Sequence, residues 1–197
     1  PPRSTLFPYT TLFRSTSDTY TVVLQSQPTA NVTVTLHPNS QVNLGSGAGV
    51  AVSLVFTVAN WSVPRGVTVT AVNDFVAEGN HSSTITHTVA SADPGYNGIA
   101  AGSVSVQITD NDTAGVTIVE SAGSTNVNEA GPTSDTYTVV LTSQPIANVT
   151  VTVQPDSQVN LGSGAGVSVS LTFTAANWST PRTVTVTAVN DAVAEGN

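Results

Sequence analysis

The chain contains no cysteine and no lysine, and only 8% of its residues are charged. Without cysteine, neither a disulfide nor a thiolate-bound metal can hold the fold together. The chain has four arginines and twelve acidic residues. Two of the arginines, Arg3 and Arg14, lie among the first fifteen residues. The whole chain carries a net charge of −8, and residues 16–197 alone carry −10. Because so few cations are present, we expect no binding to nucleic acid or to anionic lipid.

Long apolar runs and helical periodicity are also absent. No run approaches the roughly 20 apolar residues that span a bilayer, so we expect no membrane insertion. No segment shows a convincing 3.6-residue period. Thr, Ser, Val, Asn and Gly fill the chain instead, and β-branched Thr and Val favour strands over helices. An acidic, cysteine-free, Thr/Val-rich composition is typical of bacterial secreted and surface repeat proteins, so we expect an extracellular or cell-surface location.

One long segment of the sequence occurs twice. "TSDTYTVVL" begins at Thr16 and again at Thr133, an offset of 117 residues. Carried on without a gap, this offset pairs Thr16–Asn80 with Thr133–Asn197, and 54 of the 65 positions are identical. Both copies contain "SQVNLGSGAGV", "ANW" and "VTVTAVND". Such self-similarity predicts two tandem copies of one structural unit.

The first fifteen residues, "PPRSTLFPYTTLFRS", do not take part in the repeat. At the same offset they align with Ile118–Pro132 and share only Ser4 with Ser121. The stretch resembles the translation of a common sequencing-adapter oligonucleotide, and identity begins abruptly at residue 16. Pro8 breaks its apolar run and no small-residue cleavage site follows, unlike a secretory signal. We interpret residues 1–15 as an adapter-derived artefact that is not native, with a genuine edge strand as the alternative.

Apolar and polar residues alternate with a period of two throughout the repeat. In "NVTVTL" the expected inner residues are Val32, Val34 and Leu36, and "VAVSLVFT" places Val50 and Phe56 on its inner face. "DTYTVVL", "VTVTAV", "STITHTV" and "SVSVQIT" follow the same pattern, and turn sequences such as "SQP", "GSGAG" and "DPGYNG" separate them. This pattern is typical of antiparallel strands with one buried face. It predicts an all-β, immunoglobulin-like sandwich of about seven strands.

The repeat sets the expected domain boundaries. Residues 16–112 form a unit that lacks its first strand. Residues 113–197 form a second unit that lacks strands equivalent to residues 82–89 and 103–109. "TDNDTAGVTIVE", residues 109–120, is interpreted as a short linker between them. We therefore expect tandem sandwich repeats, both truncated.

Three motifs resemble the Calx-beta repeat: "AVNDFVAEGN", "VSVQITDNDTAGV" and "NVNEAGPTSDTYTVVL". The resemblance covers essentially all of residues 16–197, and its most specific part is the "ITDND" strand end followed by "NEAG". Calx-beta repeats are β-sandwiches found in a sodium–calcium exchanger, in integrin subunits and in very large bacterial surface proteins. In that family calcium lies at one pole of the sandwich. Its ligands are an early Glu, an acidic pair plus a Glu in an inter-strand loop, and the acidic run that ends the last strand.

The resemblance implies seven calcium ligands in this chain. They are Asp74 and Glu78 in the loop of the first copy, Asp191 and Glu195 in the loop of the second, Asp110 and Asp112 in the terminal run, and Glu129 as the early Glu. Asn73, Asn190 and Asn111 stand where the family has further acids, and one family Asp has no match in "GSGAGV". Fewer carboxylates imply weaker binding or a single ion. Since Leu12 occupies the position of Glu129 in the first copy, and the second copy has no terminal run, neither set is complete.

The chemistry of these residues supports the same assignment independently. Ca²⁺ takes six to eight oxygen ligands from carboxylates, amide and backbone carbonyls and water. Carboxylates gathered at loops without a cation would repel one another and resist ionisation. The residues also leave a plainer alternative open, in which "DND" is only a polar linker and "ND…E" is a solvated turn.

Other motifs are poor candidates for chemistry. "GSGAG" lacks the Lys and the strand-to-helix context of a phosphate loop and is interpreted as a flexible turn. His37, His81 and His87 have no zinc-site spacing and are expected on strand surfaces. The two tryptophans follow the same strand in each copy, and we expect them to pack in the core or between the sheets rather than to stack on a ligand. No Ser–His–Asp or Cys–His set is present, so we expect no enzymatic activity.

The sequence favours a structural spacer or stalk repeat of a large secreted or cell-surface bacterial adhesin-type protein, stiffened by Ca²⁺ at the pole between repeats. Neighbouring repeats of the same chain are the expected partners, and host or matrix glycan or protein are further candidates. The alternatives are a ligand-binding adhesion module and an accessory sandwich of an exported enzyme. The eleven substitutions between the copies scatter over several loops instead of clustering, which favours the spacer.

Overall fold

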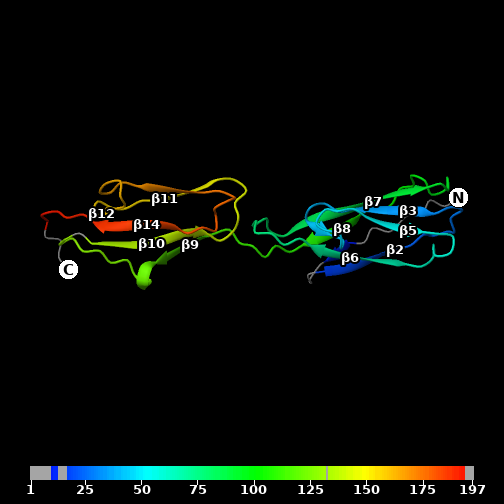
Figure 1. Cartoon of the computed structure of the whole chain (residues 1–197), viewed down its shortest axis with the longest axis horizontal. Helices are drawn as coiled ribbons and strands as arrows, with labels where there is room; N and C mark the ends of the chain where they lie inside the picture. Colours follow the sequence, from blue (N-terminus) through cyan, green and yellow to red (C-terminus); the bar gives the residue numbers. More distant parts are fainter. Residues whose placement is uncertain (1–9, 13–16, 132, 194–197) are drawn as a thin grey trace. The chain divides into compact units, whose positions relative to one another are not determined.

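The computed structural model describes residues 10–12, 17–131 and 133–193. Apart from one short 3-10 turn, η1 (Ser121–Gly123), all regular structure in these ranges is β-strand, which confirms the all-β prediction. The described part of the chain has no helix long and apolar enough to cross a membrane. Contacts divide the chain into two compact units (Figure 1). One comprises Pro1–Asp74 and Gly79–Asp110, the other Phe75–Glu78 and Asn111–Asn197.

The first unit consists of two sheets. Its strands are β1 (Thr10–Leu12), β2 (Ser17–Val22), β3 (Val32–His37), β4 (Val42–Asn43), β5 (Val52–Phe56), β6 (Arg65–Ala71), β7 (His81–Ser91) and β8 (Val104–Ile108). One sheet has the order β1-β8-β7-β3-β5, and the other has the order β2-β6-β4. All pairings are antiparallel except that of β1 with β8.

The core of the first unit lies between these sheets, which Figure 1 shows as two facing layers. A single cluster joins apolar side chains of β2, β4 and β6 to those of β3, β5, β7 and β8. Phe56, Leu36 and Val32 are 0% exposed within it. Alternating side chains of each strand point into this layer, so the period of two in the sequence becomes the inner face of a sandwich.

The second unit repeats the register of the first. Its strands are β9 (Val116–Glu120), β10 (Ser134–Leu141), β11 (Val149–Val153), β12 (Val159–Asn160), β13 (Val169–Phe173) and β14 (Arg182–Ala188). They form one sheet in the order β12-β14-β10-β9 and a pair, β11-β13. Each pairing in the first unit between residues 17 and 71 recurs exactly 117 positions later, as when Ser17↔Thr70 becomes Ser134↔Thr187. The repeated sequence therefore folds twice into one pattern.

The "GSGAG" segment is a turn held by an asparagine. The Asn43 side-chain oxygen accepts the N–H groups of Gly45 and Gly47 at 2.7 and 3.0 Å, and Asn160 does the same in the second unit. Gly45 and Gly47 have φ of 101° and 119°, a region that side chains with a Cβ rarely adopt. The glycines allow the backbone to adopt this turn, which agrees with the interpretation of "GSGAG" as a turn and not as a phosphate loop.

Two expectations were wrong. Residues 116–120, interpreted as part of a linker, form β9, which pairs antiparallel with β10. The repeat could not reveal this strand because the same offset places its first copy at the very start of the chain, where the sequence differs. Val50, expected on an inner face, is 46% exposed because it precedes β5 and lies in the turn closed by the Val50 N–H to the Gly47 carbonyl.

Strand β1 lies within the first fifteen residues. It pairs in parallel with β8, with Thr11 opposite Val106. An extended segment of almost any sequence can add to an open edge through its backbone alone, so this pairing does not bear on the origin of the stretch. The adapter interpretation stays a prediction.

Candidate metal site

The predicted calcium ligands lie in loops that follow strands. Asp74 follows β6, Asp110 and Asp112 follow β8, and Asp191 follows β14. Glu129 precedes β10, and Glu78 belongs to the short segment Phe75–Glu78 that contacts the second unit. Glu195 lies outside the described residues.

In the first unit, Asp110 is fixed against the loop that precedes β7. Its Oδ2 accepts the Gly79 N–H at 2.6 Å, and its own N–H donates to the Asn80 side-chain oxygen at 3.1 Å. The carbonyl of Gly79 lies 2.8 Å from Nδ1 of His81. These bonds bring one carboxylate and two further oxygen atoms, of Asn80 and Gly79, to the same loop.

In the second unit, Glu129 is fixed against the equivalent loop. Its Oε1 accepts the Asp191 N–H at 3.0 Å, and Oδ1 of Asp191 accepts the Val193 N–H at 2.7 Å. The structure thus brings together two of the predicted ligands, Glu129 and Asp191, which are 62 residues apart in sequence.

The contacts of Asp110 and of Glu129 are made to the two copies of the same loop. Asp191 is the counterpart of Asp74 at the offset of 117, and both begin the sequence "D-x-V-A-E-G-N". Glu129 contacts the beginning of this loop in the second unit, and Asp110 contacts its end in the first. The donors are hard oxygen ligands, which fits Ca²⁺. However, no group of three acidic or histidine side chains that could hold a metal occurs among the described residues.

Two buried or constrained carboxylates lie outside the predicted set. Asp93, 9% exposed, accepts the N–H groups of Thr29 and Gly95, and these bonds lower its pKa. Asp135 has a pKa lowered chiefly by the Ser121 hydroxyl, with help from the N–H groups of Asn126 and Thr136. Asp93 joins two loops, and Asp135 fastens a loop to β10. Asp93 is the first residue of a D-P-G turn sequence, which could have suggested its role.

His87 differs from the expectation that all three histidines lie on the surface. It is half-buried in β7, where Nδ1 donates to the Gly102 carbonyl at 2.6 Å and Nε2 accepts from the Tyr20 hydroxyl at 3.0 Å. The rings of His87 and Tyr20 meet edge to face, with centroids 5.8 Å apart. Burial lowers the pKa of His87 and outweighs the Gly102 hydrogen bond, which raises it. The neutral imidazole is therefore the form that the fold stabilises.

We expect the first unit to lose stability as the pH falls from about 7 to about 5. The folded pKa of His87 lies below its unfolded value of about 6.5, so the unfolded chain binds the proton first. The contribution is complete above the unfolded pKa and is lost as the pH falls through the folded pKa. His87→Gln should flatten this dependence, measured by urea unfolding at stepped pH. His37→Gln should flatten it much less, because His37 is exposed, Gln154 is its counterpart, and its charge is the smallest of the causes that shift the pKa of His87. An unchanged pH dependence in His87→Gln would contradict the assignment.

The tryptophans pack as expected. Trp61 lies against the core of the first unit, and Trp178 lies against that of the second. Phe75 contacts Trp178, with ring centroids 5.8 Å apart, and its carbonyl accepts the Gln144 N–H at 2.6 Å. These contacts explain why Phe75–Glu78 belongs with the second unit.

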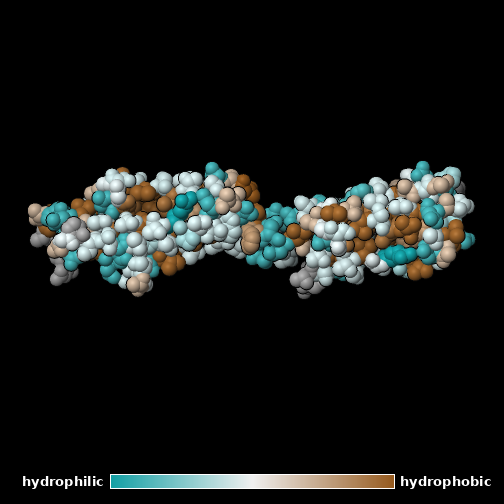
Figure 2. Space-filling model, in the orientation of Figure 1, coloured by the Kyte–Doolittle hydropathy of each residue, from teal (hydrophilic) through white to brown (hydrophobic). Residues whose placement is uncertain are grey.

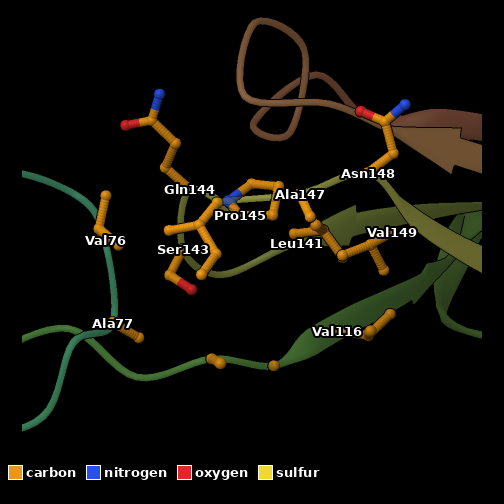
Figure 3. Close-up of a pocket in the computed structure, with 13 residues that line it drawn as sticks. Val76, Ala77, Val116, Leu141, Ser143, Gln144, Pro145, Ala147, Asn148 and Val149 are labelled. Atoms are coloured by element: carbon orange, nitrogen blue, oxygen red, sulfur yellow. The ribbon is translucent and has the colours of Figure 1, made fainter.

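A groove of about 530 Å³ also lies in the second unit (Figure 3). The turn between β10 and β11 forms one wall, with Ser143, Pro145 and Ile146, while Val76 and Val116 contribute to the others. No residue that lines it carries an ionisable side chain, so these residues offer no side-chain acid or base. Its lining suits the burial of a polypeptide segment better than chemistry on a small molecule.

The two facing antiparallel sheets of the first unit define a β-sandwich, and the second unit repeats its strand pairings. No family model and no curated protein matches the chain. Among solved structures, the chain is similar to CBD12 from CALX1.2, with 13% identity, a TM-score of 0.36 and coverage of 94% of this chain and 73% of the other. It is similar also to the calcium binding domain CBD12 of CALX1.1, with 16% identity, a TM-score of 0.37 and coverage of 93% and 73%. These values are too low to support an inference about function, which must come from this chain's own residues.

Proposed function

We propose that the chain is a pair of spacer repeats from a large secreted or cell-surface bacterial adhesin-type protein, in which Ca²⁺ binds at one pole of each sandwich. The observation that carries the proposal is the recurrence of the same strand register at an offset of 117 residues. A spacer needs units that are alike, whereas a specific ligand site needs a surface that differs. Neighbouring repeats of the same chain are then its natural partners.

The positions of the substitutions between the copies support this proposal. Ten of the eleven sites are exposed in the first copy of the repeat, and only Leu36, which is Val153 in the second copy, is buried. The exposed differences lie on β3, β5, β6 and several loops, with no single cluster. Constancy of the core combined with scattered surface change is the pattern of a unit kept for its fold.

The calcium part of the proposal rests on the loop shared by the two units. Because Glu129 reaches the beginning of this loop and Asp110 reaches its end, a repeat that holds both carboxylates would place them at the same pole. Asp112 and Asp191 would add further oxygen ligands there. The polar side chains and carbonyls of the loop could complete the six to eight donors that Ca²⁺ requires.

A rearranged chain tests the proposal. Residues 113–197 followed directly by residues 81–112 make one uninterrupted repeat of 117 residues with Glu129, Asp191, Asp110 and Asp112 together. For a dissociation constant of ~0.1 mM, 1 mM Ca²⁺ should add about 1.4 kcal/mol of stability over chelator. This corresponds to a rise in Tm of roughly 5–10 °C, measured by circular dichroism. Mg²⁺ should have much less effect, because it prefers octahedral sites and keeps its waters.

Two variants make this measurement specific. Asp110→Asn combined with Asp112→Asn should abolish the calcium-dependent rise in Tm. Asp156→Asn should keep the calcium-dependent rise, because Asp156 lies in the turn before β12, away from the predicted ligands. This substitution introduces the residue found at the equivalent position of the first copy, Asn39. A well-folded repeat whose Tm ignores Ca²⁺ would overturn the metal assignment and leave a plain structural sandwich.

A further inference from the structure

The two units differ most at the equivalent strands β3 and β11. In the first unit β3 pairs with β5 on one side and with β7 on the other, where Thr33 lies opposite Ala90. In the second unit β11 pairs with β13 alone among the described residues. Within the part of the chain that the structure describes, no strand pairs with the edge of β11 that corresponds to the β7 side of β3.

The burial of identical residues follows the same difference. Val32 and Val34 are 0% and 1% exposed in the first unit, whereas Val149 and Val151 are only half-buried. Away from this edge, Phe56 and Phe173 are both 0% exposed, although Val159 and Leu161 are also less buried than their counterparts Val42 and Leu44. Several other apolar side chains of the second unit also reach solvent, as Figure 2 shows for one face. The apolar surface left open on β11 is the surface that β7 and β8 cover in the first unit.

In the first unit, another loop covers the turn that is equivalent to one wall of the groove of the second unit. There, the loop between β7 and β8 lies on the turn Ser26–Thr29. The Tyr96 hydroxyl donates to the Ser26 carbonyl at 2.6 Å and accepts the Ser26 N–H at 3.2 Å. Asp93 Oδ2 accepts the Thr29 N–H at 2.7 Å. The equivalent turn in the second unit, Ser143–Ile146, is the wall of the groove in Figure 3.

We propose that the open edge of β11 and the groove beside Ser143–Ile146 form one docking site for a polypeptide segment with the strand–loop–strand sequence of residues 81–108. The segment would pair with β11 in the register that β7 adopts on β3. Its Tyr96 and Asp93 would bond to the turn as they do at Ser26 and Thr29. Its alternating apolar residues, Ile85, Val89, Val104, Val106 and Ile108, are buried in the first unit and would cover the open face. The site acts by addition of strands to a sheet edge and does not depend on calcium.

Binding of a peptide to the intact chain tests this proposal. A fluorescein-labelled peptide of residues 79–112 is titrated with the 197-residue chain in chelator, and anisotropy is measured. We expect saturable binding with one peptide per chain. Peptides with Tyr96→Phe or Asp93→Ala should each bind about five- to tenfold more weakly, because each loses hydrogen bonds to the turn. A scrambled peptide of the same composition should not bind.

A disulfide locates the docked peptide, since the chain has no cysteine of its own. Directly opposite residues on antiparallel strands have Cα atoms about 4.5–5.5 Å apart, within the range of a disulfide. The peptide with Ala90→Cys should therefore crosslink to a chain with Thr150→Cys, the counterpart of Thr33. The matched control is a chain with Thr33→Cys, whose partner strand β7 is already in place.

Crosslinking at position 150 but not at position 33, together with the weaker binding of the two variant peptides, would establish the site. Absence of saturable binding would overturn it. Equal crosslinking at both positions would also overturn it, because the peptide would then be exchanging into the first unit or binding without register. Rapid disulfide formation between two Thr150→Cys chains, unaffected by peptide, would show that a second copy covers the β11 edge instead.

Discussion

Replacing Phe56 with alanine is expected to lower the free energy of unfolding of the first unit by about 3–5 kcal/mol and to leave the second unit unchanged. Phe56 is 0% exposed at the end of β5, and the Arg65 guanidinium carbon lies 5.9 Å from its ring centroid. Truncation removes the largest fully buried side chain of that core and leaves a cavity that the flanking strands cannot close. Such a loss is a large part of the stability of a single domain.

The second unit supplies the matched variant. Phe173 occupies the same position and is also 0% exposed, so Phe173→Ala should destabilise only the second unit. Each unit holds one tryptophan against its core, so fluorescence in a Trp178→Phe background follows the first unit, and a Trp61→Phe background follows the second. Denaturant unfolding in both backgrounds separates the two transitions. If either alanine variant shifted both transitions equally, the two cores would not be independent.

Placing a carboxylate at Val34 is expected to unfold the first unit, at a cost of more than about 4 kcal/mol, whereas Val151→Asp in the second unit should cost about 1–2 kcal/mol. The two valines are equivalent in sequence and in register. Val34 is 1% exposed between β5 and β7, so a charge there would be buried without a partner. Val151 is half-buried on a strand with one described neighbour, and a carboxylate there can reach water.

The same denaturant experiment measures both costs. Val34→Thr and Val151→Thr serve as controls, because threonine keeps the shape of valine without a charge. Similar losses for the two aspartate variants would mean that β11 is as well covered as β3, and would remove the basis of the docking site as well. The comparison therefore tests the consequence of the open edge without any added peptide.

The strands of the repeated segment could be predicted because two local signals agree. Alternation with a period of two gives the inner face, and Asn43 with Gly45 and Gly47 gives the turn. The prediction failed at two places, β9 and the start of β5. Strand β9 has no repeated counterpart in the sequence, and Val50 continues the alternation before the start of β5. Periodicity identifies which residues can share a face, but backbone pairing decides where a strand begins.

The candidate site was predictable in its residue types but not in its contacts. The sequence, through its resemblance to a known repeat, pointed to Asp110 and Glu129. That each of them accepts a hydrogen bond from the loop after β6 or β14 depends on chain segments 31 and 62 residues away. Asp93 and Asp135 were not singled out, and His87 was expected on a strand surface, because their hydrogen bonds and burial arise from segments that come together only in the fold.

By itself, the sequence determined an acidic, cysteine-free chain with two copies of an alternating β pattern, and hence antiparallel sheets with apolar inner faces. The sequence also predicted that the second unit lacks strands equivalent to residues 82–89 and 103–109, and only the tertiary structure decided which identical residues this leaves less covered. Val34 and Val151 have the same neighbours in sequence, yet one is closed in by β7 and the other is not. The reason is that burial depends on strands distant in the chain, so identical local sequences end in different environments when those strands are placed against only one of them.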